Sequence, residues 1–193
     1  MTVSDRIPPE EVWVLSYYRA SELAGALLFG RLARRTTDGE LAVFLTAQFA
    51  EEARHAWQWT DTLRRLGHRP VPITETYQSR YAREIDLPTS MPKILALTQV
   101  FEERIYQHFA LHARRADTHP LVRDTLEQML RDEDGHLDWV RAKLAEYEAS
   151  GLIDLAAVVR KYREVDERIY GDVIAYERRL WEFLGMTLVD GPP

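Results

Sequence analysis

The sequence contains no cysteine, and this absence excludes disulfide bonds, thiolate zinc sites, iron–sulfur clusters and cysteine nucleophiles. Any bound metal ion is therefore expected to have nitrogen and oxygen ligands. The chain also lacks an uncharged apolar run of the ~18 residues that a membrane-spanning helix needs, and residues 1–10 lack the apolar segment of a signal sequence. These absences predict a soluble, cytoplasmic protein.

Glycine and proline are scarce, with nine of each among 193 residues, whereas hydrophobic residues make up 46% and charged residues 29%. This composition is typical of a chain that buries a core, and it excludes a disordered or low-complexity protein. The length predicts a single domain over residues 1–193. The net charge of −6 disfavours nucleic acid and anionic membranes, which attract clustered basic residues. We therefore expect small molecules and metal cations as ligands.

The positions of proline divide the chain into helices, because proline inside a helix removes a backbone hydrogen bond and clashes with the preceding turn. The proline-free stretches and their capping signals predict five helices and no strand. The predicted helices span residues 11–35, 39–66, 92–116, 120–149 and 154–184.

The lengths of the connections predict how these helices are arranged. Short connections join antiparallel neighbours, whereas the connection after the second helix, from residue 67 to about 90, is long enough to cross a bundle from end to end. We therefore expect an all-α protein, with a ferritin-like four-helix bundle over residues 11–149 and one long crossover between helices two and three. Residues 154–184 would add a C-terminal fifth helix that covers the bundle or forms a dimer interface.

Two of the predicted helices carry an acid and an imidazole in the middle of an otherwise apolar stripe. Glu52 and His55 lie there on the second helix, and Glu133 and His136 lie there on the fourth. A shift of 81 residues superposes the two Glu-x-x-His pairs. The middle of the bundle is therefore predicted to be polar.

The first and third helices share a second repeat, E-x6-F-x3-A-R-R, with a shift of 80 residues. It begins at Glu22 and at Glu102, so each half of the chain contributes one lone glutamate and one Glu-x-x-His pair. Four glutamates in a low-dielectric core would each cost several kcal/mol unless their charges are neutralised. Two divalent cations would neutralise them, with the imidazoles as neutral ligands. The alternative is that these residues are hydrogen-bonded core groups or surface residues.

These motifs resemble the ferritin-like di-iron carboxylate superfamily over residues 11–149. The run Glu-Glu-Ala-Arg-His at 51–55 is similar to the helix signature of acyl desaturases and related oxygen-activating members, and Glu-x-Arg-x4-Phe at 102–109 is similar to the third helix of the tRNA hydroxylase branch. The resemblance implies a cofactor of two iron ions, or of one iron and one manganese ion. It implies six metal ligands: Glu22, Glu52, His55, Glu102, Glu133 and His136.

Glu103 competes with Glu102 for the place of the third-helix ligand. The internal repeat selects Glu102, and the residues on its face of the helix are more apolar than those around Glu103. We therefore expect Glu102 to be the ligand, and Glu103 to be at most a shifting or supporting carboxylate.

Several other residues lie within one turn of the predicted ligands. Tyr18 and Tyr106 are candidate catalytic residues that would donate a hydrogen bond or proton near the metals, although aromatic core packing is an alternative for both. Glu51 and Asp132 each precede a predicted ligand histidine by one turn, so either could orient an imidazole, as could partners from a neighbouring helix.

Seven further residues of the predicted helices bear on the site. Trp59 and Trp139 would serve electron transfer, shielding of the metals or simple packing. The small residues Gly25, Ala26 and Gly30 would leave room for dioxygen and substrate or would allow close helix packing. His108 and His112 lie off the Glu102 stripe and are expected to be solvated.

The function expected from these features is a di-iron oxidoreductase that activates dioxygen to oxidise or hydroxylate an organic small molecule. Such an enzyme needs an external electron donor, and a homodimer is expected. One alternative is a ferroxidase or a rubrerythrin-like peroxidase, which would need a separate reductase because this chain has no cysteine-ligated domain. A second alternative is a non-catalytic scaffold that binds metal for folding.

Overall fold

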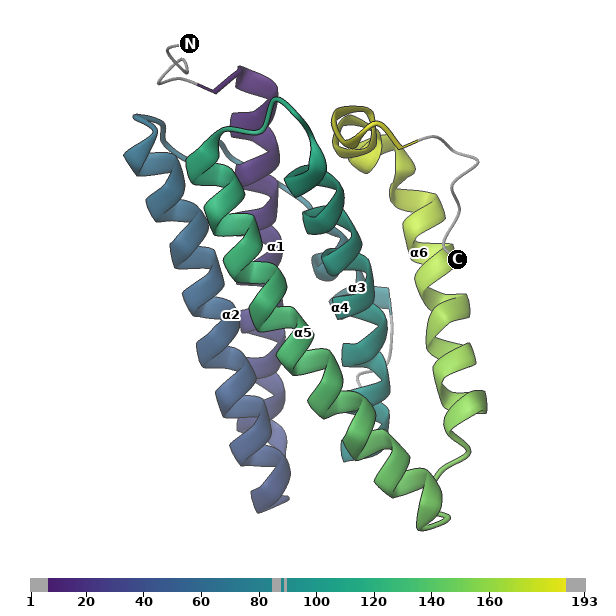
Figure 1. Cartoon of the computed structure of the whole chain (residues 1–193). Helices are drawn as coiled ribbons and strands as arrows, with labels where there is room; N and C mark the ends of the chain where they lie inside the picture. The colour runs from purple at the N-terminus through teal and green to yellow at the C-terminus, as the bar shows by residue number, and fades with distance from the viewer. Residues whose placement is uncertain (1–6, 85–87, 89, 187–193) are drawn as a thin grey trace.

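The computed structural model describes residues 7–84, 88 and 90–186, and within these ranges the regular structure is entirely α-helical (Figure 1). The all-α prediction is therefore confirmed, and each predicted helix agrees with the structure to within two residues at either end. The helices are α1 (Pro9–Arg35), α2 (Gly39–Arg65), α3 (Tyr77–Glu84), α4 (Met91–Arg114), α5 (Pro120–Ala149) and α6 (Leu155–Leu184).

Four of the helices form the predicted ferritin-like bundle. α1 packs along α2 and α4 packs along α5, and the long connection after α2 carries the chain from one pair to the other (Figure 1). Side chains of the residues that precede α2 and α6 explain where these two helices begin. Asp38 accepts a hydrogen bond from the Leu41 amide (2.9 Å) at the start of α2, and Asp154 accepts one from the Ala157 amide (2.9 Å) at the start of α6.

α3 is a short helix inside the crossover that the sequence analysis missed. Only eight residues long, it is too short to show a helical repeat that stands out in the sequence. It buries Tyr77 and Tyr81, which are one turn apart, and it packs against α1 and α6. Burial of these two rings between helices that are distant in the sequence gives α3 its stability.

α6 covers the bundle on the side of α4, and it leaves the face formed by α2 and α5 uncovered (Figure 1). A buried carboxylate anchors it. Asp166 accepts a hydrogen bond from the Tyr81 hydroxyl (2.7 Å) and pairs with the buried guanidinium of Arg104. Within the described residues, no helix combines the length and the apolar character needed to cross a membrane.

The apolar core is divided into two clusters. In the view of Figure 1, the upper cluster includes Leu15, Trp59 and Leu126, and the lower cluster includes Leu45 and Leu144. On each bundle helix, the residues between the two clusters are the polar ones that the sequence analysis selected. The fold therefore places a polar layer across the middle of a bundle whose core is otherwise apolar.

Candidate metal centre

The four predicted glutamates are almost completely buried in the polar layer. Each comes from a different bundle helix, and their exposed fractions are 1% for Glu22, 4% for Glu52, 3% for Glu102 and 1% for Glu133. Carboxylates buried to this degree are uncommon in proteins unless a cation or a dense set of hydrogen bonds compensates them. The number of hydrogen-bond donors around the four carboxylates therefore shows whether the protein alone can stabilise them.

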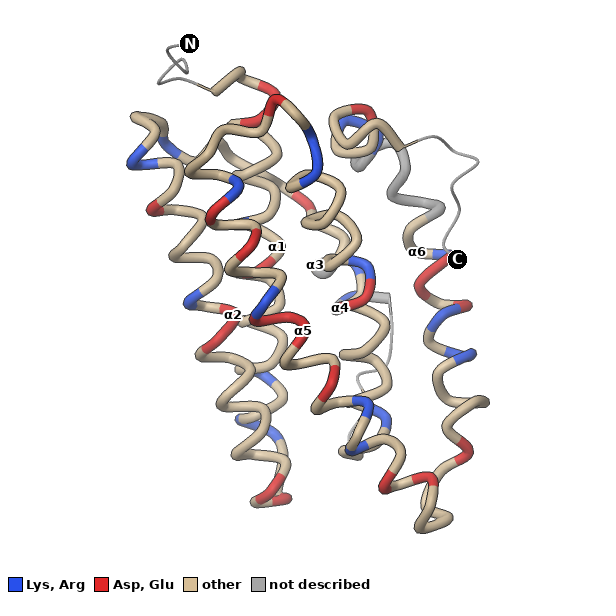
Figure 2. Tube along the Cα trace, viewed as in Figure 1, with Lys and Arg blue, Asp and Glu red and all other residues tan. Residues whose placement is uncertain are grey.

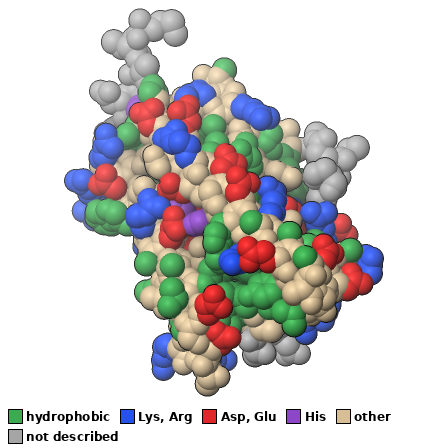
Figure 3. All heavy atoms as spheres, turned by 60° about the horizontal axis from the view of Figure 1, so that its bottom comes forward, with side chains coloured by type: hydrophobic (Ala, Val, Ile, Leu, Met, Phe, Trp, Pro, Cys, Tyr) green, Lys and Arg blue, Asp and Glu red, His purple; other side chains and the backbone are tan. Residues whose placement is uncertain are grey.

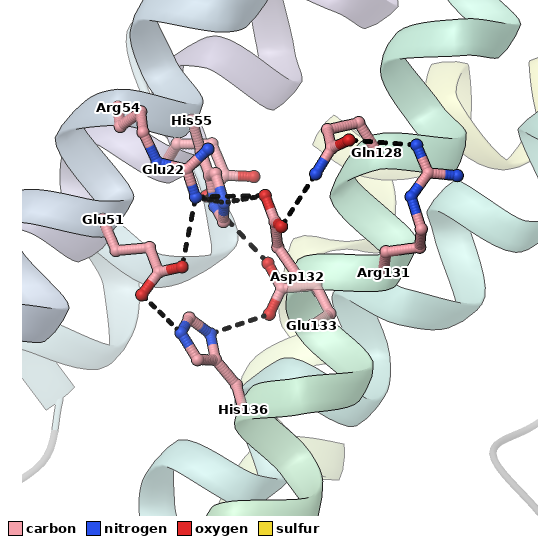
Figure 4. Close-up of polar contacts among 9 residues, drawn as sticks. All are labelled: Glu22, Glu51, Arg54, His55, Gln128, Arg131, Asp132, Glu133 and His136. Carbon is pink, nitrogen blue, oxygen red and sulfur yellow. Dashed lines mark hydrogen bonds and ion pairs between the residues drawn. The ribbon is translucent and has the colours of Figure 1, made fainter.

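Both predicted histidines direct Nδ1 toward these glutamates. His55 Nδ1 lies 3.8 Å from Glu22 Oε2 and 3.5 Å from Glu133 Oε1, and His136 Nδ1 lies 3.6 Å from Glu133 Oε2 (Figure 4). Glu102, Glu133 and His136 each offer one atom within 4.8 Å of the others. The structure thus brings the predicted ligands from all four helices to one place.

The donor count is too low for these acids to be satisfied by the protein alone. Among the six predicted ligands, the buried atoms that lack a hydrogen-bond partner are Glu22 Oε1, His55 Nδ1, Glu102 Oε2, Glu133 Oε2 and His136 Nδ1. A set of carboxylate oxygens and imidazole nitrogens, all buried and without partners, matches the ligand chemistry of iron, manganese or zinc. The residues present therefore fit a metal centre in the place where the superfamily carries one.

The other ring nitrogen of each histidine is held by an acid from the opposite helix. His136 Nε2 donates to Glu51 Oε2 of α2 (2.6 Å), and His55 Nε2 donates to Asp132 Oδ2 of α5 (3.3 Å). Arg54 lies between the two acids, 3.1 Å from Glu51 and 3.0 Å from Asp132 (Figure 4). Figure 2 shows acidic residues of α2 and α5 at the mid-height of the bundle.

This crossed arrangement decides between the alternatives for Glu51 and Asp132. Each acid orients the histidine of the neighbouring helix and not the one that follows it in sequence. An Nε2 proton held by a carboxylate leaves Nδ1 deprotonated and free to bind a cation. Glu51, His55 and Asp132 are also close enough to bind a cation themselves, but the guanidinium of Arg54 already occupies that position.

We expect Glu51→Ala to lower metal affinity by about 10–100-fold, because the His136 ring loses the acid that fixes its orientation and raises its basicity. Competition with a chelator for Fe(II), followed spectroscopically under anaerobic conditions, measures this change. Glu127→Ala is the matched control, since Glu127 is an exposed acid of the same kind on α5. Equal affinities for the two variants would show that Glu51 has no part in the centre.

Burial and mutual repulsion raise the pKa of three of the buried glutamates in the metal-free protein. Burial first, and then the charge of Glu102, raises the pKa of Glu52 well above its ordinary value. Burial, then the charge of Glu133, raises the pKa of Glu102 in the same way, and burial with the charge of Glu22 raises the pKa of Glu133 to about 8. Burial lowers the pKa of His55, but the Glu22 carboxylate outweighs it and the net shift is upward. Metal binding is therefore expected to release protons.

These shifts predict that the metal-free protein loses stability as the pH rises. A carboxyl group whose folded-state pKa is raised holds a proton that the unfolded chain has lost, so its contribution is present below the ordinary pKa of 4.5 and is lost as the pH rises through the folded value of about 8 for Glu133. His55 acts in the same direction.

We expect the melting temperature of the metal-free protein to fall between pH 7 and pH 9, and that of the metal-loaded protein to fall less, because bound cations stabilise the ionised carboxylates. Calorimetric scans of both forms across this range measure the difference. Parallel curves for the two forms would contradict the placement of these acids around a cation.

Glu102 and Glu103 are separated clearly by the structure. Glu102 faces the polar layer, whereas the Glu103 carboxylate accepts hydrogen bonds from Gln99 (2.9 Å), Arg141 (3.3 Å) and Arg163 (3.1 Å) on the outer side of α4. The choice of Glu102 from the internal repeat agrees with this placement.

The two candidate tyrosines lie in different surroundings. Tyr18 is buried at 2% exposure beside Glu22, and its ring contacts Trp59 and Phe109. Tyr106 is only half-buried, and its hydroxyl is paired with the exposed Asp134. The structure thus keeps Tyr18 beside Glu22 and pairs the Tyr106 hydroxyl with Asp134. A catalytic role for either tyrosine stays a prediction.

The prediction that His108 and His112 are solvated is wrong, because both side chains are buried. His108 shares a hydrogen bond with the Tyr170 hydroxyl of α6 (3.0 Å), and His112 pairs with Glu11 of α1 (3.3 Å). Burial, followed by the charge of Arg104, lowers the pKa of His108 to about 3. The pattern of α4 alone does not reveal this, since the cover comes from elements distant in the sequence.

The two tryptophans that follow the predicted ligand histidines differ in burial. Trp59 is completely buried in the upper cluster, whereas Trp139 is 42% exposed and stacks on Phe44 with 4.9 Å between ring centroids. The role of Arg54 between the two acids was not predicted from the sequence. Its position one residue before His55 was the available signal.

The bundle with its crossover, and the acids and imidazoles in its middle, define a ferritin-like protein of the di-iron carboxylate superfamily. A family model described as Rubrerythrin matches residues 14–167, which include the whole polar layer, and the chain belongs to this family. No curated protein and no solved structure gave a significant match. The resemblance to the superfamily that the motifs carry is therefore confirmed.

Proposed function

We propose that the protein is a di-iron, or iron–manganese, oxidoreductase that reduces dioxygen and oxidises an organic small molecule. The ligands would be Glu22, Glu52, His55, Glu102, Glu133 and His136. The observation that carries the proposal is the convergence of buried carboxylate and imidazole atoms that have no hydrogen-bond partner. Four acids and two neutral imidazoles balance two divalent cations in charge and supply ligands of the type iron accepts.

The residues of the chain have distinct parts in this function. Iron, when bound, would supply the redox chemistry that side chains lack. Glu51 and Asp132 orient the imidazoles through Nε2. Arg54 pairs with both acids, and at Asp132 its guanidinium outweighs the effect of burial and lowers the pKa. The two apolar clusters exclude water on either side of the polar layer, which strengthens every charge interaction within it.

An organic substrate is favoured by a pocket of about 470 Å³ that is lined by His136 and Glu51 at one end and mostly by apolar side chains elsewhere. A peroxide or Fe(II) substrate would need no such space. Reduction of dioxygen to water takes four electrons, and oxidation of the substrate supplies two of them. An external electron donor has to supply the other two and is therefore part of the proposal. The homodimer and the cytoplasmic location stay predictions.

The rubrerythrin family itself favours a second candidate, a peroxidase in which peroxide is the substrate. The two candidates share the metal centre and differ in the oxidant that they consume. The absence of cysteine means that a peroxidase of this kind would also depend on a separate reductase.

Anaerobic loading with Fe(II), metal counting, and then exposure to dioxygen or to hydrogen peroxide tests the proposal. We expect about two iron ions per chain, as the superfamily arrangement requires, and a Mössbauer and optical change that is faster with dioxygen. A faster response to peroxide would favour the peroxidase. Stable binding of zinc without binding of iron would favour a non-catalytic scaffold.

A further inference from the structure

A deep groove lies between α2 and α5 on the face that α6 leaves uncovered. It runs from Glu51 and His136 at its inner end to Glu40 and Tyr147 at its outer end, and we name it the α2–α5 groove. Figure 1 shows α2 and α5 diverging along this part of the bundle, and Figure 3 shows hydrophobic side chains gathered in a hollow next to a histidine on the surface. The groove therefore begins at the candidate metal centre.

The floor and walls of the groove are apolar. Leu95 of α4 (0% exposed) and Val140 of α5 (1% exposed) form its floor, and Phe44 with the stacked Trp139 forms a wall. The volume of about 470 Å³ lies within the range of small-molecule sites. Residues 136 and 147 are eleven positions apart on α5, so the groove is about 16 Å long at ~1.5 Å per residue.

The charges along the groove disfavour an anion. Glu40 and Glu51 are acidic, and the ammonium group of Lys143, the one basic residue of the lining, lies 2.8 Å from the carboxylate of Glu146. A carboxylate or phosphate in the groove would lie beside acidic side chains and would find the ammonium group of Lys143 already paired, whereas an uncharged molecule would meet no such repulsion.

We propose that the α2–α5 groove binds an elongated, uncharged, mainly hydrocarbon substrate, with the end to be oxidised against the side of the centre formed by Glu51 and His136. The orientation rests on the proposed function, but the binding itself does not. A second copy of the chain fits less well, since the apolar floor lies below the two helices and a flat helical surface would not reach it.

Calorimetric titration with decan-1-ol, hexan-1-ol and decanoate tests the groove on metal-free protein and on anaerobic Fe(II)-loaded protein. Neither form turns over without dioxygen, so the readout is binding alone. We expect saturable binding of decan-1-ol, at least tenfold weaker binding of the shorter alcohol because less apolar surface is buried, and weaker binding of decanoate because of the acidic lining.

Ala47→Trp and Ala50→Trp form a matched pair of variants. Both alanines are exposed positions of α2, but only Ala47 lines the groove. The tryptophan at position 47 fills the groove from its rim without entering the core, so we expect at least a tenfold loss of decan-1-ol affinity, with unchanged Fe(II) loading and melting temperature. The variant at position 50 should bind like the wild type.

Three results would overturn the proposal. They are no saturable binding of decan-1-ol, equal loss of affinity in the two variants, or a dimer in light scattering that Ala47→Trp dissociates. The last result would assign the groove to a second copy. Because the number of bound iron ions is measured separately, a groove that fails this test leaves the metal centre standing, and a failed metal centre leaves the binding result intact.

Discussion

Glu102→Gln should abolish tight binding of a metal pair, while Glu103→Gln should leave it unchanged. The two variants change adjacent residues in the same way and keep the side-chain volume. Glu102 is buried in the polar layer with Oε2 unpartnered, whereas Glu103 bonds to Arg141 and Arg163 on the outer side. Mutation of a residue that supports a metal ligand typically lowers metal affinity about 10–100-fold. Loss of an anionic ligand itself should lower metal affinity by more than this.

The stability of the metal-free protein separates this effect from misfolding. The charge of Glu133 is among the causes that raise the pKa of Glu102, so removal of the Glu102 carboxylate relieves a repulsion and should not lower the melting temperature of the metal-free protein. The rise in melting temperature on addition of Fe(II) or Zn(II) should disappear in Glu102→Gln only. A retained rise would refute the assignment of Glu102 as a ligand.

Gly25→Ala should damage the metal centre through a single methyl group. A Cβ atom at this position would lie 2.6 Å from Glu52 Oε2 and 3.3 Å from the carboxylate carbon, so the carboxylate has to move. Alanine is the better helix former by about 1 kcal/mol, and the end of a glutamate side chain shifts easily. We therefore expect metal affinity to fall by at least about tenfold, while the metal-free protein keeps or gains stability.

Gly30→Ala is the control for this substitution. It is also on α1, and its Cβ atom would meet the ring of Phe49 at 3.2 Å, but that ring is 41% exposed and is not part of the polar layer. Metal titration and melting curves of both variants measure the contrast. If the two variants bind metal equally well, the close approach of Gly25 to Glu52 serves packing alone.

Much of the candidate site follows from helical geometry within single segments. A residue and its partner three positions later lie on one face of a helix, so Glu52 with His55, and Glu133 with His136, were predictable as pairs once their helices were recognised. The internal repeat then separated Glu102 from Glu103. Each of these inferences needed only spacings along the sequence and nothing about which helices are neighbours in space.

Contacts between segments were beyond this reasoning. Tyr106 is one turn from Glu102 but turns to Asp134, and His108 is buried because α6 brings Tyr170 to it. Helical spacing says which residues share a face, but which neighbour covers that face depends on how the elements pack. The pairing of Tyr106 and the burial of His108 therefore have a common origin.

The sequence by itself determined the five long helices, their approximate boundaries, and the four glutamates and two histidines on the core stripes, because local hydrogen bonding and the helical period act within each segment. Only the tertiary structure decided that Glu51 holds His136 and Asp132 holds His55, that α6 leaves one face open, and that a groove there reaches the centre. These features arise where separate helices meet, and their relative positions are set by the packing of the whole core.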